Sequence, residues 1–180
     1  FPANLRKYIK ATREEKKNVL QKMEREIGLT RVKQAIRAIE VRMRRTSPDK
    51  VFPGHYCFLG NPGVGKTRMA QKLGNVLQAT NVLKQGLVIV RTAREMMEQC
   101  HNFDKIIRMA RENILFIDEA HQLADTAAGF DVIKRLLTVL EDTEVMKNTC
   151  IVLAGYPREM EDLFQVDAGL RSRFDSEDNI

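Results

Sequence analysis

The sequence predicts an α/β domain built on a doubly wound parallel sheet. Four short apolar runs have the length of buried strands, and they lie at residues 55–59, 87–90, 114–117 and 150–154. Segments with helical periodicity separate these runs, so strands and helices alternate along the chain. Alternation at this spacing is typical of a parallel sheet with helices on both faces. Ligands bind such sheets at the carboxyl ends of the strands, so polar residues that follow the runs are the first candidates for a site.

Size and composition agree with one globular domain. A chain of 180 residues with 43% apolar and 30% charged residues can bury a full core, and no stretch is apolar enough for a membrane span. The three cysteines are far apart, and two lie in strand-like runs, so we expect reduced buried thiols and a cytoplasmic compartment. The chain begins at Phe1 with neither an initiator Met nor a signal-peptide core, so we expect an excised fragment.

The positive charge is concentrated in the first fifty residues. Residues 1–50 hold 15 Lys and Arg against 6 Asp and Glu, whereas residues 51–180 hold 15 against 18. A basic segment indicates either the solvated face of charged helices or contact with nucleic acid. Because the segment lacks an interleaved set of aromatics for base stacking, the solvated face is favoured.

Two helices are expected in this basic part. Apolar residues at helical spacing predict a helix over residues 3–27 with a narrow apolar face. Gly28 to Thr30 interrupts it, and a second helix runs from Thr30 as N-cap to Thr46, before Pro48. We therefore divide the chain into a basic helical extension, residues 1–27, and an α/β core, residues 28–180.

The remaining elements follow from local signals. The 87–90 run predicts a central parallel strand, and Thr92 with Glu95 has the spacing of a capping box that opens a helix. Asn102 is the expected cap of the next helix. Two helix faces are expected to be buried: Phe103, Ile106, Ile107 and Ala110, and then Phe130, Ile133, Leu137 and Leu140.

Residues 60–67, Gly-Asn-Pro-Gly-Val-Gly-Lys-Thr, match the phosphate-binding pattern of P-loop NTPases at every fixed position. A strand precedes this loop and a helix follows it, so backbone N–H groups at the helix N-terminus face the phosphates. Lys66 supplies charge to the β- and γ-phosphates, and Thr67 is placed to ligate Mg²⁺. The sequence thus predicts a nucleoside triphosphate site. Its expected contacts are Asn61, Pro62, Gly63, Val64, Gly65, Lys66, Thr67 and Arg68.

Asp118 and Glu119 follow the third apolar run directly, in the order of a Walker B element. We expect Asp118 to hold the Mg²⁺ shell and Glu119 to orient and polarise the attacking water. His121 extends the run to Asp-Glu-Ala-His, which some helicases share, but the other helicase motifs are not visible. We therefore interpret His121 only as a polar neighbour of the site.

Arg171 and Arg173 flank Ser172 after the fourth strand. Such a pair is compatible with ordinary surface charge or with an arginine finger, which neutralises charge on the transferring phosphoryl group. The two Walker elements earlier in the chain favour the finger.

Together these motifs resemble the AAA+ ATPases, and within them the group of red-type Rubisco activase CbbX and stage V sporulation protein K. The resemblance runs from about residue 24 to 175. It is carried by residues 27–29 with 32–33, 60–67, 115–120, 153–156 and 169–174.

The resemblance implies strand order 5-1-4-3-2, with ATP and Mg²⁺ as ligands. Ile27 and Gly28 would border the adenine, and Tyr156 would stand at the position of the sensor-1 residue. Arg173, with Arg171 as second choice, would act on the nucleotide of a neighbouring subunit. A finger supplied in this way implies a homo-oligomeric ring, usually a hexamer.

The sequence departs from the group at two points. It ends at Ile180, at or before the expected fifth strand, so we expect the helical lid and its sensor-2 arginine to be absent. The segment between Glu98 and Phe103 is shorter than the pore loop of the group and lacks its aromatic-glycine pair. Either this protein does not thread polypeptide in that way, or residues of the loop are missing from the sequence.

The leading hypothesis is an Mg-ATP-hydrolysing core whose oligomer remodels a protein client. One alternative is a nucleotide-gated scaffold with little turnover, which the short pore segment favours. Another is a nucleic-acid-handling module, which the basic first fifty residues favour.

Overall fold

The computed structural model describes residue 41 and residues 52–174. The two predicted N-terminal helices, apart from residue 41, and the two residues expected beside adenine, Ile27 and Gly28, therefore lie outside the described residues. The expected fifth strand, after Phe174, does as well.

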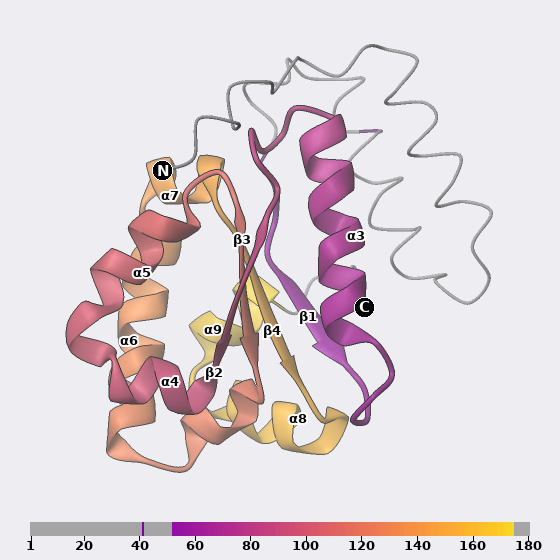
Figure 1. The fold of residues 1–180 in the computed structure, drawn as a ribbon. Coiled ribbons are helices and arrows are strands. Elements are labelled where there is room, and N and C mark those ends of the chain that lie inside the picture. The colour runs from indigo at the N-terminus through magenta and orange to yellow at the C-terminus, as the bar shows by residue number, and fades with distance from the viewer. Residues whose placement is uncertain (1–40, 42–51, 175–180) are drawn as a thin grey trace.

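The described strands form a parallel sheet in the order β1-β4-β3-β2 (Figure 1). This order confirms the 1-4-3-2 part of the predicted arrangement. The strands are β1 (Tyr56–Leu59), β2 (Val88–Thr92), β3 (Ile114–Asp118) and β4 (Cys150–Gly155). Leu59 pairs with Gly155, and Thr92 pairs with Asp118, so the carboxyl ends of all four strands meet at one edge.

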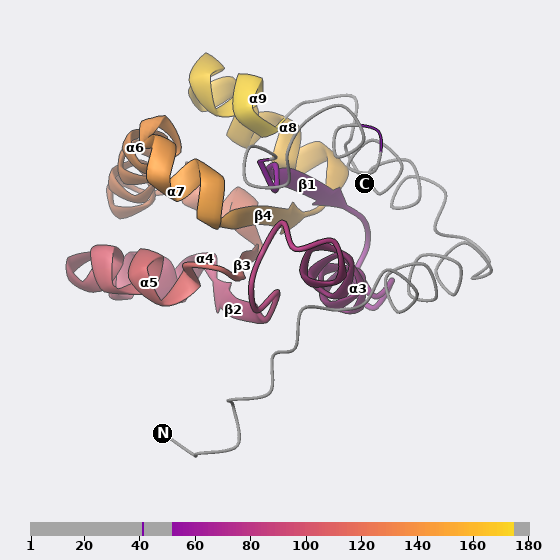
Figure 2. The ribbon, with the colours of Figure 1, turned by 90° about the horizontal axis from the view of Figure 1, so that it is seen from above.

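Helices cover both faces of the sheet, as predicted (Figure 2). The long helix α3 (Lys66–Ala79) packs on one face. The other face carries α4 (Ala93–Glu98), α5 (Phe103–Ala110), α6 (Ala127–Glu141), α7 (Thr143–Asn148), α8 (Pro157–Val166) and α9 (Ala168–Phe174). Two short 3₁₀ turns, η3 (Cys100–Asn102) and η4 (Ala120–Ala124), lie between these helices.

The core is divided by the sheet into two clusters. Along β3, Ile114 and Phe116 belong to the cluster under α3, whereas Leu115 and Ile117 belong to the cluster under the other helices. Because both faces of the strand are covered, its sequence is a continuous apolar run rather than an alternating one. Cys57 and Cys150 are buried in this core, as expected from their apolar context, whereas Cys100 is only partly buried. In the described part of the chain, no helix is both long and apolar enough to cross a bilayer.

The prediction that residues 87–90 form a central strand is wrong. They contribute to β2, which lies at the edge of the described sheet, and Val90 is 41% exposed. An apolar run signals burial of side chains but carries no information about strand order. The capping box beside it is confirmed, since Glu95 N donates to Thr92 Oγ1 at 3.1 Å and Thr92 N donates to Glu95 Oε2 at 2.7 Å.

Two helix predictions need correction. Asn102 stands at the N-cap of α5, but its side chain makes no capping bond, although the predicted α5 face is buried. In α6, Phe130 is 39% exposed and Leu137 is only partly buried, whereas Val132 and Leu136 are buried beside the predicted Ile133 and Leu140. Close packing of Gly129 on Leu123 fixes the rotation of α6 about its own axis, because an added Cβ at Gly129 would lie 2.1 Å from the Leu123 carbonyl oxygen.

Candidate functional site

A cavity of about 310 Å³ opens at the carboxyl edge of the sheet. It draws residues from the ends of three strands that are far apart in the sequence. The lining residues are Pro62, Gly63, Gly65, Lys66, Thr67, Asp118, Glu119, His121, Gly155 and Tyr156. The structure thus brings together most of the residues that the sequence proposed for a site.

The loop after β1 has the backbone that its glycines allow. Gly63 and Gly65 have φ of 77° and 89°, in the left-handed region that favours glycine. Gly65 is also the N-cap of α3, so the helix N-terminus opens into the cavity. Gly60 N donates to Gly155 O at 3.1 Å, which ties the loop to the end of β4.

Lys66 is held inside this loop. Its Nζ donates to Gly60 O at 2.7 Å and to Asn61 O at 3.2 Å. The same Nζ lies 5.6 Å from the centroid of the Tyr156 ring, within the range of a cation–π contact. The ammonium group is therefore restrained from two sides at the cavity wall.

The two acidic residues are fixed by the turn that follows β3. Glu119 adopts a left-handed backbone conformation with φ 52° and ψ 35°, which for a residue other than glycine costs about 1 kcal/mol or more. Glu119 N donates to Asp118 Oδ1 at 3.0 Å, and Gln122 Nε2 donates to Glu119 Oε2 at 3.1 Å. Both carboxylates line the cavity.

Tyr156 and His121 form an aromatic pair in the cavity wall. Their rings lie 5.0 Å apart at 34°. His121 Nδ1 is buried and has no hydrogen-bond partner among the described residues. A Cβ at Gly155 would lie 2.9 Å from this atom, so the approach of the imidazole to β4 requires glycine there.

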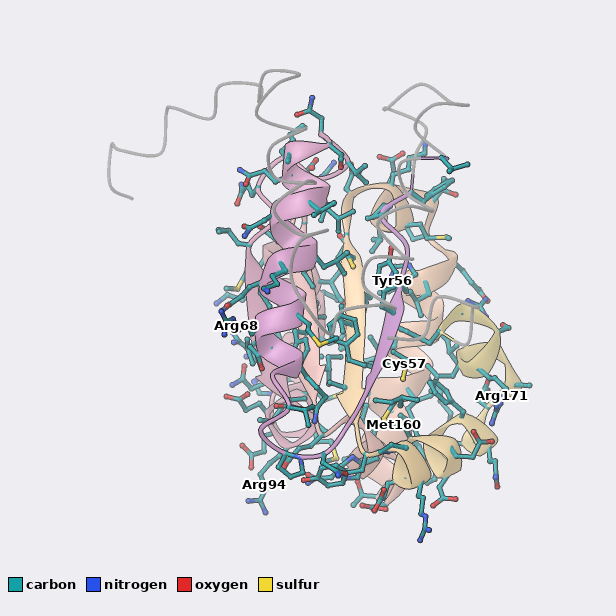
Figure 3. All side chains as sticks on the ribbon, turned by 90° about the vertical axis from the view of Figure 1, so that its right-hand side faces the viewer. Tyr56, Cys57, Arg68, Arg94, Met160 and Arg171 are labelled. Atoms are coloured by element: carbon teal, nitrogen blue, oxygen red, sulfur yellow. The ribbon has the colours of Figure 1, made fainter. Side chains whose placement is uncertain are left out.

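Other predicted site residues do not line the cavity. Asn61 and Val64 are exposed and are not among its lining residues, and Arg68 points outwards from α3, away from the sheet (Figure 3). Arg171 pairs with Glu161, and Arg173 Nη2 lies 3.0 Å from Glu141 Oε1. Both arginines are on α9 and are not brought to the cavity of their own chain.

Two residues of this region were not assigned to the site from the sequence, Gln122 and Gly155. Gln122 gave no signal by itself, since its contact with Glu119 depends on the left-handed turn between them. Gly155 lies in the Ala-Gly-Tyr segment, where its place directly after an apolar strand could have indicated a cavity wall.

The residues of the cavity fit a nucleoside triphosphate with Mg²⁺. A helix N-terminus and a lysine are the groups that favour phosphate, and they share one wall. Thr67 and Asp118 line the same cavity, and their side chains carry a hydroxyl and a carboxylate. Oxygen ligands of this kind suit Mg²⁺, which also keeps waters and substrate phosphates in its shell.

One family model matches most of the described residues. Residues 56–180 match the model of the AAA family, "ATPase family associated with various cellular activities".

Curated relatives agree with this match. The chain is 32% identical over 174 residues to "Protein cbbX homolog, chloroplastic" of Guillardia theta, covering 87% of this chain and 46% of that protein. It is 32% identical over 174 residues to "Protein CbbX" of Cereibacter sphaeroides, covering 87% and 56%. It is 35% identical over 128 residues to "Stage V sporulation protein K" of Bacillus subtilis, covering 67% and 39%. The chain spans about half the length of the curated relatives it matches.

Solved structures with a similar fold include Thermotoga maritima RuvB. A structure of one variant of that protein superposes with a TM-score of 0.54 at 25% identity, covering 82% of this chain and 43% of that one. A structure described as the "RuvB Holliday junction branch migration motor" gives a TM-score of 0.52 at 27% identity, covering 82% and 43%.

Proposed function

The chain belongs to the AAA family of ATPases, and from this premise we propose that it binds Mg-ATP and hydrolyses it in an oligomeric ring that remodels a protein client. The observation that carries the proposal is the shared cavity lined by Lys66, Asp118 and Glu119. A phosphate-binding loop alone would support binding. The glutamate at the same cavity adds a group that can activate water.

Each cavity residue has a distinct task in this proposal. Lys66 contacts the β- and γ-phosphates, and Thr67 with Asp118 holds Mg²⁺, which neutralises charge on the phosphate oxygens. Glu119 orients the attacking water and accepts its proton. Tyr156, in the position we assign to sensor 1, lies between the lysine and His121, within reach of the phosphate end of the nucleotide.

The arginines on α9 support action between subunits. Neither Arg171 nor Arg173 lines the cavity of its own chain, so a role in catalysis requires a neighbouring chain. We propose that Arg173, with Arg171 as the alternative, completes the neighbour's site and exchanges its ion pair with Glu141 for the phosphate. A closed ring, usually of six subunits, supplies one such contact to each site.

The protein client is proposed from the relatives. One relative, 31% identical, bears the name ribulose bisphosphate carboxylase/oxygenase activase and is therefore named for an action on another protein. We extend to this chain only the general class, a protein client, and we place the activity in the cytoplasm on the strength of the buried thiols.

The test is ATP turnover and ATP binding by the full chain and two variants. Lys66→Ala should lose binding, because the phosphates lose their cation. Glu119→Gln should keep binding and lose turnover, because the amide cannot take a proton from water. Wild-type turnover in Glu119→Gln would remove Glu119 from the mechanism. Light scattering in ATP and in ADP tests the ring, and a monomer at every protein concentration would contradict it.

A nucleic-acid-handling module is the second candidate. It is favoured by the basic first fifty residues and by the fold shared with a protein described as a branch migration motor. DNA or RNA binding that weakens steeply with salt, and weakens again on neutralising Arg42, Arg44 and Arg45, would support it. A nucleotide-gated scaffold would instead show ATP-dependent assembly with almost no turnover.

A further inference from the structure

Resting on the proposed function, we propose that Gln122 is a positioning residue that holds the Glu119 carboxylate in the orientation from which it activates water. Gln122 does not line the cavity, whereas Glu119 does. Gln122 therefore acts through the glutamate and not on the nucleotide.

Gln122 contacts Glu119 twice. The backbone N of Gln122 donates to the Glu119 carbonyl oxygen at 3.0 Å, and the side-chain Nε2 donates to Glu119 Oε2 at 3.1 Å. The first bond closes the turn that begins at the left-handed Glu119 backbone, and the second restrains the carboxylate. One residue thus fixes both the main chain and the side chain of the catalytic candidate.

The turn that carries Gln122 is itself firmly anchored. Ala120 is fully buried, and Leu123 is 1% exposed, so residues on both sides of the 121–122 pair are fixed in the core. Glu119 N in turn donates to Asp118 Oδ1, so a continuous chain of hydrogen bonds links Gln122, Glu119 and Asp118. The backbone from which the Gln122 amide extends is therefore held by packing on both sides.

The chemistry of an amide suits this task. A glutamate carboxylate has two oxygens, and the bond from Gln122 engages Oε2 and leaves Oε1 for a water in the cavity. A lysine or arginine in the same place would bind the carboxylate as an ion pair and lower its basicity. An uncharged donor restrains the group while leaving it able to accept a proton.

The test is a substitution that keeps length and removes the donor. In the full chain, Gln122→Met should lower kcat by about ten- to a hundredfold, because a misplacement of about 1 Å can cost about 10²-fold. The Kd for ATP and the midpoint of thermal unfolding should stay at their wild-type values. Gln122→Glu should lose at least as much, because it places a second carboxylate beside the first. Gln71→Met, at an exposed position of α3, is the matched control and should behave as wild type.

A second comparison separates positioning from general damage. In a Glu119→Gln background, Gln122→Met should cause no further loss of turnover, because the group it positions has already been removed. A wild-type kcat in Gln122→Met overturns the inference while leaving the proposed function in place. A kcat loss accompanied by equal losses of ATP affinity and thermal stability also overturns it. A wild-type chain that binds ATP without hydrolysing it overturns the proposed function and the inference together.

Discussion

Two glutamates lie at opposite ends of β3. Both have a positive φ, which is uncommon for a residue other than glycine, but their side chains make different contacts. Glu112, before the strand, has φ 63°, and Glu119, after it, has φ 52°. Glu112 accepts from Lys84 N at 3.1 Å and pairs with Lys84 Nζ at 3.2 Å. Glu119 is restrained by one amide and lines the cavity. Both residues have a positive φ, but the Glu112 side chain binds Lys84 at the amino end of β3, whereas Glu119 lines the cavity at the carboxyl end.

The surroundings of the two glutamates differ in the same way. At the amino end, Asn113 is buried, its Oδ1 accepts from Leu87 N at 3.0 Å, and its Nδ2 donates to Arg111 O at 2.9 Å. At the carboxyl end, His121 Nδ1 is buried with no hydrogen-bond partner among the described residues. Buried polar atoms are usually satisfied, so an exception such as His121 Nδ1, in the cavity wall, asks for an explanation, and a catalytic role nearby is one. Substitutions at the amino end should therefore change stability, and substitutions at the carboxyl end should change turnover.

The largest expected effect comes from the same substitution made in both glutamates. Glu119→Gln should lower ATP turnover about 10³-fold, the usual range for loss of a general base, with little change in the free energy of unfolding. Glu112→Gln should lower the free energy of unfolding by about 1 kcal/mol, through loss of the ion pair, and leave turnover unchanged. Steady-state kinetics and urea unfolding on both variants check this. A turnover defect in Glu112→Gln would contradict the division between a glutamate that affects stability and one that affects turnover.

The next effect in size is expected from acid, which should lower the free energy of unfolding through His55, at the amino end of the sheet. His55 precedes β1 and its Nδ1 accepts from Ile151 N at 3.1 Å. Burial, with a smaller contribution from the positive charge of Arg173, lowers the pKa of His55 from 6.5 to about 4. The unfolded chain takes up this proton near pH 6.5, whereas the folded chain does so only near pH 4. Stability is therefore full above pH 6.5 and falls by up to about 3 kcal/mol as the pH drops to 4.

Urea unfolding at several pH values tests this sign. His55→Gln, which can still accept from Ile151 N, should show a shallower decline between pH 6.5 and 4. Equal slopes for the variant and the wild type would show that His55 does not carry the acid sensitivity.

An effect smaller than that of acid on His55 is expected at Asn113. Asn113→Ala leaves Leu87 N without its acceptor in a part-buried place, which should lower the free energy of unfolding by about 2 kcal/mol. Asn148→Ala is the control, because its side-chain bond to Glu144 O is exposed and water can replace it. ATP turnover per folded molecule should match wild type in both variants. Equal free energies of unfolding in the two variants would contradict a stabilising role for the Asn113 hydrogen bonds at the amino end of β3.

The predictions that succeeded depended on short stretches of sequence. The alternation of apolar runs with helical segments indicated the order of elements, and Thr92 with Glu95 formed the expected capping box. The failures concerned packing. The run at 87–90 became an edge strand, and contact with η4 fixes α6 in a rotation that leaves Phe130 exposed. Periodicity indicates that one face of a helix or strand is apolar, but it does not indicate which element packs against that face.

The sequence by itself determined the P-loop motif at residues 60–67, the acidic pair after β3 and the α/β class, because each depends on the identity and spacing of neighbouring residues. Only the tertiary structure decided that Lys66, Asp118 and Tyr156 share one cavity, because the order β1-β4-β3-β2 aligns three distant strand ends. It also decided that Arg171 and Arg173 stay outside that cavity, and that Gln122 reaches Glu119 through a left-handed turn. These features depend on strand order and on a backbone conformation that residue spacing does not encode.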